Sequence, residues 1–97
     1  MEFEWNEIKR TTNIRVRQLD FEDAAEMFGK PMLTQPDNRS PYGEMRQVGM
    51  GYVKGRLMVV VFTERKRDVI RIISYRKANK REQAKYEKAI KNKLEIH

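Results

Sequence analysis

The sequence contains no cysteine, which excludes disulfide bonds and thiolate metal sites in this chain. Its single histidine is the last residue, His97, so most chemistry that depends on an imidazole is excluded as well. The longest apolar run, LMVVVF (57–62), is too short to span a bilayer, and the opening MEFEWNEIKR lacks the basic-then-apolar order of a signal peptide. These absences predict a cytoplasmic protein that has no membrane segment and uses no bound metal or cofactor.

Charge, in contrast, is abundant and unevenly distributed. Of the 97 residues, 36% are charged, and the net charge is +7. Residues 1–64 contain nine basic and ten acidic side chains, a net charge of −1, whereas residues 65–97 contain twelve basic and four acidic ones, a net charge of +8. A charge this polarised favours a polyanion or an acidic protein as partner, and the alternative is that it serves only solubility.

The N-terminal part of the chain predicts one strand, two helices and a loop. EFEW (2–5) alternates as a short strand does, and Asn6 is a suitable N-cap for a helix over 8–17. Apolar residues then recur at helical spacing over 21–28, which predicts a second, amphipathic helix of two turns. The segment 29–43 contains all three prolines and predicts a long irregular loop.

The remaining chain predicts strands followed by a closing helix. The predicted strands cover 44–53, 56–64 and 69–75. Lys54-Gly55 suits a two-residue hairpin turn, and Asn79 with Glu82 has the spacing of a capping box at the start of the last helix. The apolar stripe of that helix consists of Tyr86, Ala89, Ile90 and Leu94. The order β-α-α-β-β-β-α predicts a single α+β domain over 1–97, with an antiparallel sheet packed by helices.

Residues that could carry chemistry gather near the ends of the last two predicted strands. Glu64 and Arg65 end one strand, Arg71 lies on the next, and Arg76 and Lys77 follow its far end. Such a set can hold an RNA backbone and stabilise charge on a phosphate, because the planar arginine fork meets two phosphate oxygens at once. As alternatives, Arg71 could extend its head from the strand to water, and Glu64 could serve only to pair with a neighbouring arginine. No glycine-rich phosphate loop and no nucleophile with a histidine base occurs.

Five segments then follow one another in an order and at a spacing that resemble one known family. They are FEWNEIKRTTN (3–13), LDFEDAAEMF (19–28), YGEMR (42–46), GRLMVVVFTER (55–65) and IRIISYRKANKREQAKYE (70–87). Together they resemble the BrnT family, the toxin half of type II toxin–antitoxin pairs. The resemblance implies a RelE/ParE-like ribonuclease fold, metal-independent RNA cleavage and inhibition of translation. It also implies a BrnA-like antitoxin partner with a ribbon-helix-helix segment, so that DNA is reached only through the antitoxin.

The resemblance further implies a site. In RelE-like enzymes the 2′-hydroxyl attacks the neighbouring phosphate, and protein cations stabilise the crowded intermediate. The basic positions of the family fall on Arg65, Arg71 and Arg76, which together with Glu64 form the expected catalytic set. The residues expected to bind RNA are Lys77, Lys80, Arg81, Tyr75 and Arg17.

The sequence departs from the family pattern at one point. The family has Lys-His-Gly before the second helix, where this chain has Val16, Arg17 and Gln18. Without that histidine, proton transfer falls to Glu64, to Tyr75, to a lysine or to no residue, because arginine stays protonated. We expect the lost glycine to lengthen or re-angle the first helix. Two functions therefore stay open: a ribonuclease toxin, or an inactive relative that binds RNA or the antitoxin.

Overall fold

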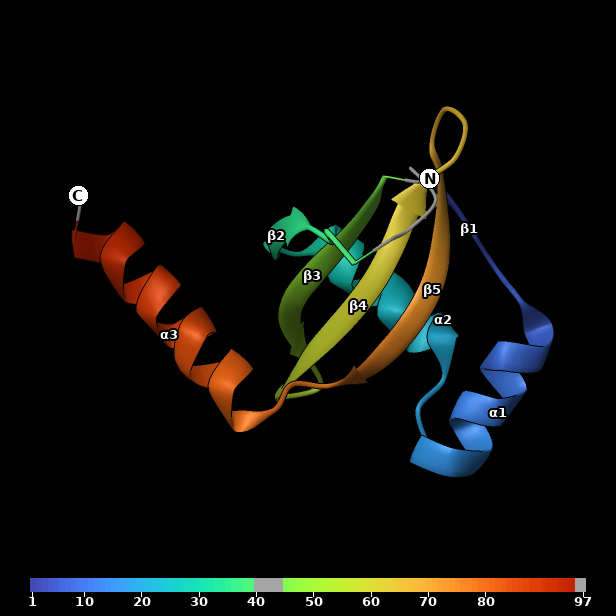
Figure 1. Ribbon diagram of the computed structural model, residues 1–97, viewed down its shortest axis with the longest axis horizontal. Coiled ribbons are helices and arrows are strands. Elements are labelled where there is room, and N and C mark those ends of the chain that lie inside the picture. Colours follow the sequence, from blue (N-terminus) through green and yellow to red (C-terminus); the bar gives the residue numbers. More distant parts are fainter. Residues whose placement is uncertain (40–44, 96–97) are drawn as a thin grey trace.

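The computed structural model describes residues 1–39 and 45–95, which form one five-stranded sheet with helices (Figure 1). Along the chain the elements are β1 (Glu2–Trp5), α1 (Glu7–Arg17), α2 (Phe21–Ala24), the 3₁₀ helix η1 (Ala25–Gly29), β2 (Leu33–Pro36), β3 (Arg46–Val53), β4 (Arg56–Glu64), β5 (Val69–Lys77) and α3 (Lys80–Glu95). The strands are ordered β1-β5-β4-β3-β2 across the sheet. This arrangement confirms the predicted α+β class.

Two features of the sheet differ from the prediction. First, β1 pairs with β5 in parallel, so the sheet is mixed and not antiparallel throughout. Three helical elements, α1, α2 and η1, separate β1 from the other strands in sequence, so no hairpin turn sets its direction. Second, residues 33–36 of the predicted loop form an edge strand antiparallel to β3. Pro36 is tolerated there because it ends a strand at the edge of the sheet. Residues 40–43 of that loop prediction lie outside the described ranges.

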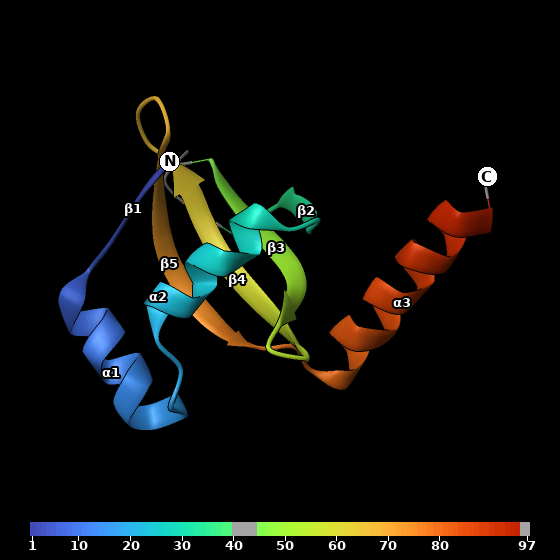
Figure 2. The same ribbon diagram turned by 180° about the vertical axis from the view of Figure 1, so that it is seen from behind.

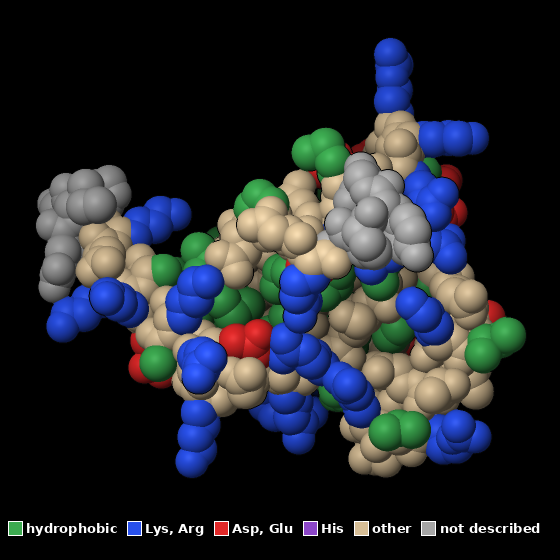
Figure 3. Space-filling view, viewed as in Figure 1, with side chains coloured by type: hydrophobic (Ala, Val, Ile, Leu, Met, Phe, Trp, Pro, Cys, Tyr) green, Lys and Arg blue, Asp and Glu red, His purple; other side chains and the backbone are tan. Residues whose placement is uncertain are grey.

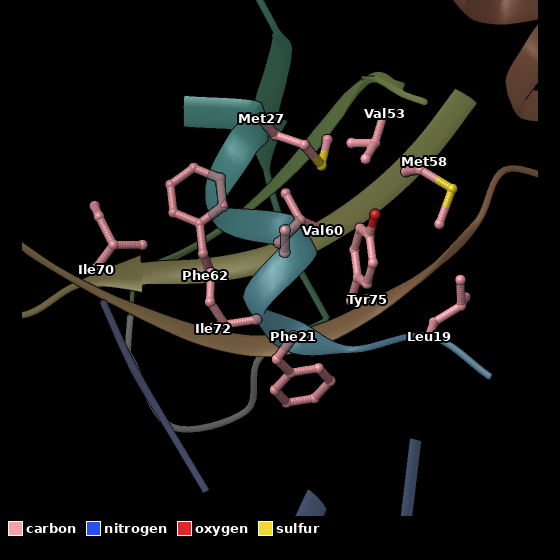
Figure 4. Close-up of a cluster of buried hydrophobic side chains, with 11 residues drawn as sticks. Leu19, Phe21, Met27, Val53, Met58, Val60, Phe62, Ile70, Ile72 and Tyr75 are labelled. Carbon is pink, nitrogen blue, oxygen red and sulfur yellow. The ribbon is translucent and has the colours of Figure 1, made fainter. Parts of the chain in front are cut away.

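The main core lies between the sheet and the short helices α2 and η1, which cross one face (Figure 2). The predicted two-turn helix over 21–28 is α-helical only to Ala24 and tightens into η1 from Ala25. Met27 is 1% exposed in this tight turn. The side chains of this cluster come from both layers and pack together as Figure 4 shows. The opposite face of the sheet is more open, and it carries the candidate site.

Local signals in the sequence set the ends of several elements as predicted. The Asn6 side chain accepts a hydrogen bond from the Lys9 N–H, which caps α1. Lys54 and Gly55 both have positive φ, 50° and 80°, as a hairpin turn of the I′ type requires. Asn79 and Glu82 cap each other with backbone-to-side-chain hydrogen bonds of 2.9 and 2.8 Å.

The first helix does not continue through the position of the lost glycine. α1 ends at Arg17, and Gln18 takes the left-handed conformation, with φ 57° and ψ 34°, that the family glycine would adopt more easily. The Gln18 N–H bonds to the carbonyl of Ile14 at 2.8 Å, and its side-chain amide donates to the carbonyl of Arg15 at 3.2 Å. Gln18 therefore ends the helix in the left-handed conformation although it has a Cβ, and this conformation costs free energy.

The C-terminal helix α3 leaves the end of β5 and extends away from the sheet (Figures 1 and 2). Of its predicted apolar stripe, Tyr86 packs on a second, smaller cluster on the open face and meets Tyr52 edge-on at 5.6 Å. Ile90 is 37% exposed, and the Leu94 side chain lies outside the described part of the chain. Within the described ranges, no helix has the length and apolar character needed to cross a membrane.

Candidate functional site

A β-bulge in β5 brings the two predicted arginines of that strand to the same face of the sheet. In a regular strand, residues five apart such as Arg71 and Arg76 point to opposite faces. Here the register between β5 and β4 shifts between Val61 and Phe62, which leaves Ile73 as an extra residue in β5. Beyond the bulge, Arg76 therefore lies on the same open face as Arg71.

Four cations converge beside this bulge. They are Lys9 from α1, Arg46 from β3, Arg65 just after β4 and Arg71 from β5, and they line a pocket of about 170 Å³. The register explains part of the convergence, because Arg46 and Arg71 pair with Thr63 from either side and so lie on one row across the sheet. We call these four residues the cation cluster. Lys and Arg side chains also stand out across this open face in the space-filling view (Figure 3).

A carboxylate from the neighbouring edge strand lies beside the cation cluster. Glu4 of β1 pairs with Arg71 in the sheet register, and its Oε1 is 3.5 Å from Nη1 of Arg71 and 3.8 Å from Nε of Arg65. Both distances exceed those of strong charge-assisted hydrogen bonds, and all three side chains are 30 to 50% exposed. Ion pairs of this kind are weak, so an incoming phosphate can compete with Glu4 for the arginines.

The helix α1, which contributes Lys9, is held in place by polar contacts, since it buries none of its own residues. Arg10 donates two hydrogen bonds to Asp20, of 2.8 and 3.0 Å, and these bonds lower the pKa of Asp20 and raise that of Arg10. The Asn13 amide donates to the carbonyls of Leu19 and Tyr75, both at 3.0 Å. These bonds tie α1 both to the start of α2 and to β5.

A larger cavity lies between α1 and the sheet, next to the cation cluster. We call it the α1 cavity; its volume is about 570 Å³. Its lining residues are Ile8, Lys9, Thr12, Asn13, Val16, Arg17, Phe21, Arg39, Val61, Ile73, Ser74 and Arg76. Lys9 and Ile73 line both the α1 cavity and the pocket of the cation cluster, and we refer to these two as the hollows. The two hollows are therefore adjacent parts of one surface.

Arg76 lines the α1 cavity, but its guanidinium is engaged by α3. Nη1 and Nη2 donate to the two carboxylate oxygens of Glu82, both at 2.8 Å, and Nη1 also contacts the Lys77 carbonyl at 3.2 Å. These bonds lower the pKa of Glu82 to about 2, with a further contribution from the Asn79 N–H, and raise the pKa of Arg76. The fork that was expected to meet phosphate thus anchors the start of α3 in this structure.

The other predicted residues fall in different surroundings. Glu64 lies exposed at the end of β4 and lines neither hollow, whereas Arg17 is exposed on the last turn of α1 and lines the α1 cavity. Lys77, Lys80 and Arg81 are exposed around the start of α3 and line neither hollow.

Tyr75 does not fit the role predicted for it. Its side chain is 1% exposed and packs in the main core (Figure 4), so it cannot stack on a base. Burial raises the pKa of its hydroxyl to about 12, which makes it a poor proton carrier near neutral pH. The bulge is the physical reason, because it turns Tyr75 toward α2 and its two neighbours toward the open face.

Sequence reasoning missed two members of the cation cluster, Lys9 and Arg46. Both lie in segments that carry the family resemblance, FEWNEIKRTTN and YGEMR, so a signal for them was present. What the sequence could not show is that α1 and β3 bring these side chains beside Arg65 and Arg71.

Comparisons with known proteins identify the family and agree with the fold. A family model described as the ribonuclease toxin BrnT of type II toxin–antitoxin systems matches residues 5–82. The crystal structure of the Brucella abortus ribonuclease toxin BrnT matches with a TM-score of 0.67 and 28% sequence identity, over 82% of this chain and 99% of that one. A comparison with curated proteins gives no match. The chain therefore belongs to the BrnT family of ribonuclease toxins of type II toxin–antitoxin systems.

Proposed function

We propose that this ribonuclease toxin binds the scissile phosphate of RNA at the cation cluster. The observation that carries the proposal is the convergence of Lys9, Arg46, Arg65 and Arg71 from four separate elements on one small pocket. Oriented cations stabilise charge that develops on phosphate oxygens, and three arginines can do so through planar, two-point contacts. Arg76 is not part of this site. It lines the neighbouring cavity, and its guanidinium is hydrogen-bonded to Glu82.

In the proposed reaction, the 2′-hydroxyl attacks the adjacent phosphorus while the bond to the 5′-oxygen of the next nucleotide breaks. The products are a 2′,3′-cyclic phosphate and a 5′-hydroxyl. The 2′-oxygen loses a proton and the leaving oxygen gains one. Within the cluster, the Lys9 ammonium can donate the proton that the leaving oxygen gains, because arginine stays protonated, and solvent water takes the proton that the 2′-oxygen loses. Four protein cations supply the positive charge, so the proposed reaction needs no metal ion or cofactor.

A type II system includes an antitoxin that neutralises the toxin, and RNA is the substrate class of the family. We propose further that the antitoxin is a BrnA-like ribbon-helix-helix protein, that it covers the cation cluster, and that RNA cleavage inhibits translation. On this proposal residues 1–97 act as one toxin domain in the cytoplasm, without a membrane contact, and DNA is contacted only through the antitoxin.

The test is cleavage of a mixed RNA substrate in the presence of EDTA, with the product ends analysed for 2′,3′-cyclic phosphate. Arg71→Ala should lower kcat/KM by about 100-fold or more, the effect of removing one oriented charge-stabilising group. Arg67→Ala is the matched control, because Arg67 is exposed in the β4–β5 turn and lines neither hollow. It should cleave at the wild-type rate.

Other outcomes would point elsewhere. RNA binding without cleavage, with an affinity that falls with salt at a slope of roughly −0.7 per phosphate contact, would favour the inactive, RNA-binding relative. An equal loss for Arg67→Ala and Arg71→Ala would contradict a site at the cation cluster.

A further inference from the structure

The α1 cavity lies directly beside the proposed phosphate site and is not used by the proposed reaction. At about 570 Å³ it falls within the size range of pockets for small organic ligands, whereas the pocket of the cation cluster is about 170 Å³. Lys9 and Ile73 line both hollows. A group bound in the α1 cavity would therefore be the next chemical unit along a strand whose phosphate sits on the cations.

The walls of the α1 cavity are apolar on two opposing sides. Val61 and Ile73 contribute from the sheet, and Ile8 and Val16 contribute from α1. The two α1 residues are 79% and 64% exposed, so they leave apolar surface at the mouth of the cavity that a ligand can cover. On this face, hydrophobic surface is visible between the Lys and Arg side chains (Figure 3). Two apolar walls suit a flat ring that can insert between them.

The rim of the α1 cavity is polar, as the edge of a nucleobase requires. Thr12 and Ser74 offer hydroxyls, and Arg17 and Arg39 offer guanidinium planes on which a base can stack. Asn13 is held by the two hydrogen bonds that its Nδ2 donates, so its amide oxygen has a fixed orientation. That oxygen accepts no hydrogen bond from any side chain that the structure describes, and it can accept one from a base.

We infer that the α1 cavity binds the nucleobase of the nucleotide adjacent to the scissile phosphate and thereby gives the toxin a base preference. The inference rests on the proposed phosphate site at the cation cluster. Stacking between apolar and guanidinium surfaces supplies the affinity, and hydrogen bonds from the rim to the base edge supply the selectivity. A fixed distance between phosphate and base then selects the bond that is cleaved.

The test uses short RNAs that carry 2′-O-methyl groups and cannot be cleaved, with the base removed at one position at a time. Affinity is measured by fluorescence anisotropy for wild type, Thr12→Trp and Thr11→Trp. Thr12 lines the α1 cavity, and a tryptophan there fills it. Thr11 is the matched control, since it is exposed on the same helix and does not line the cavity.

For wild type, removal of the base at one position should weaken binding by roughly tenfold, in the range of one base stack. Thr12→Trp should bind the intact RNA more weakly than wild type does, by the same factor. It should bind the RNA that lacks this base as well as wild type does. Thr11→Trp should behave as wild type. Equal weakening of intact and abasic RNA by Thr12→Trp would overturn the inference, and so would an absence of any sensitive position.

The failure of the proposed reaction is distinguishable from the failure of the base pocket. Arg71→Ala should lower the affinity for intact and for abasic RNA by the same factor, because Arg71 contacts the phosphate in the proposed site. If base-dependent binding is seen while cleavable RNA stays intact in the EDTA assay, the cleavage proposal fails and the base pocket stands. If cleavage depends on Arg71 and no base position matters, the base pocket fails alone.

Discussion

Glu82→Gln tests how much the ion pair between Arg76 and Glu82, which attaches α3 to β5, contributes to stability. The substitution removes the charge that faces Arg76 but keeps the capping box, because glutamine at this position also accepts the Asn79 N–H. The pKa of Glu82 lies at about 2 in the folded protein, against an ordinary value of 4.5. At about 1.4 kcal/mol for each pKa unit, this difference sets an upper limit of roughly 3–4 kcal/mol. Because the two side chains are 22% and 31% exposed, solvent screening reduces the expected effect to about 1–2 kcal/mol.

The sign of the pH dependence follows from the lowered pKa. Glu82 binds its proton more weakly in the folded than in the unfolded protein, so the ion pair stabilises the fold above about pH 4.5. This stabilisation is lost as the pH falls toward 2. The difference in unfolding free energy between wild type and Glu82→Gln should therefore be full at pH 7 and nearly absent near pH 2.

Urea unfolding followed by circular dichroism at several pH values measures this difference. Glu87→Gln removes the same formal charge from an exposed position of α3 and serves as the control. It should change the unfolding free energy by less than about 0.5 kcal/mol at every pH. A Glu82→Gln effect as small as this at pH 7, or one that does not change with pH, would refute the reasoning.

Three further predictions concern the first helix and its end. Asn13→Ala should lower the unfolding free energy by about 1–3 kcal/mol, because the carbonyls of Leu19 and Tyr75 lose their donor, and thermal unfolding that is unchanged would contradict this. Gln18→Gly should raise it by about 0.5–1 kcal/mol, because glycine adopts the left-handed conformation without strain, and a loss of stability would show that the side-chain bond matters more. Arg17→Ala removes one guanidinium plane from the α1 cavity and should weaken the binding of intact RNA several-fold more than the binding of the abasic RNA; equal weakening of both would exclude base stacking on this residue.

Several elements could be predicted from the sequence because their signals are local. The cap at Asn6, the turn at Lys54-Gly55 and the capping box of Asn79 with Glu82 all act between residues no more than a few positions apart. Such interactions form in the same way wherever the segment is placed. The family was also recognisable from the sequence, because its motifs are read along the chain and need no geometry.

The parts that could not be predicted depend on partners far away in the sequence. Residues 33–36 form a strand only because β3 offers an edge with which they can pair. The bulge at Ile73 comes from the register between β4 and β5. The sequence of β5 contains no glycine from which a bulge could be predicted. That single extra residue turns Tyr75 into the core and brings Arg76 to the open face.

The sequence by itself thus determined which basic residues this protein carries, its family and the boundaries of most of its helices and strands. The tertiary structure alone decided which of those residues meet. Lys9 lies beside Arg65 and Arg71 in one pocket, whereas Arg76 forms hydrogen bonds with Glu82. The physical reason is that helix caps and turns are set by interactions within a few residues, whereas a binding site is set by strand register and by contacts between distant segments.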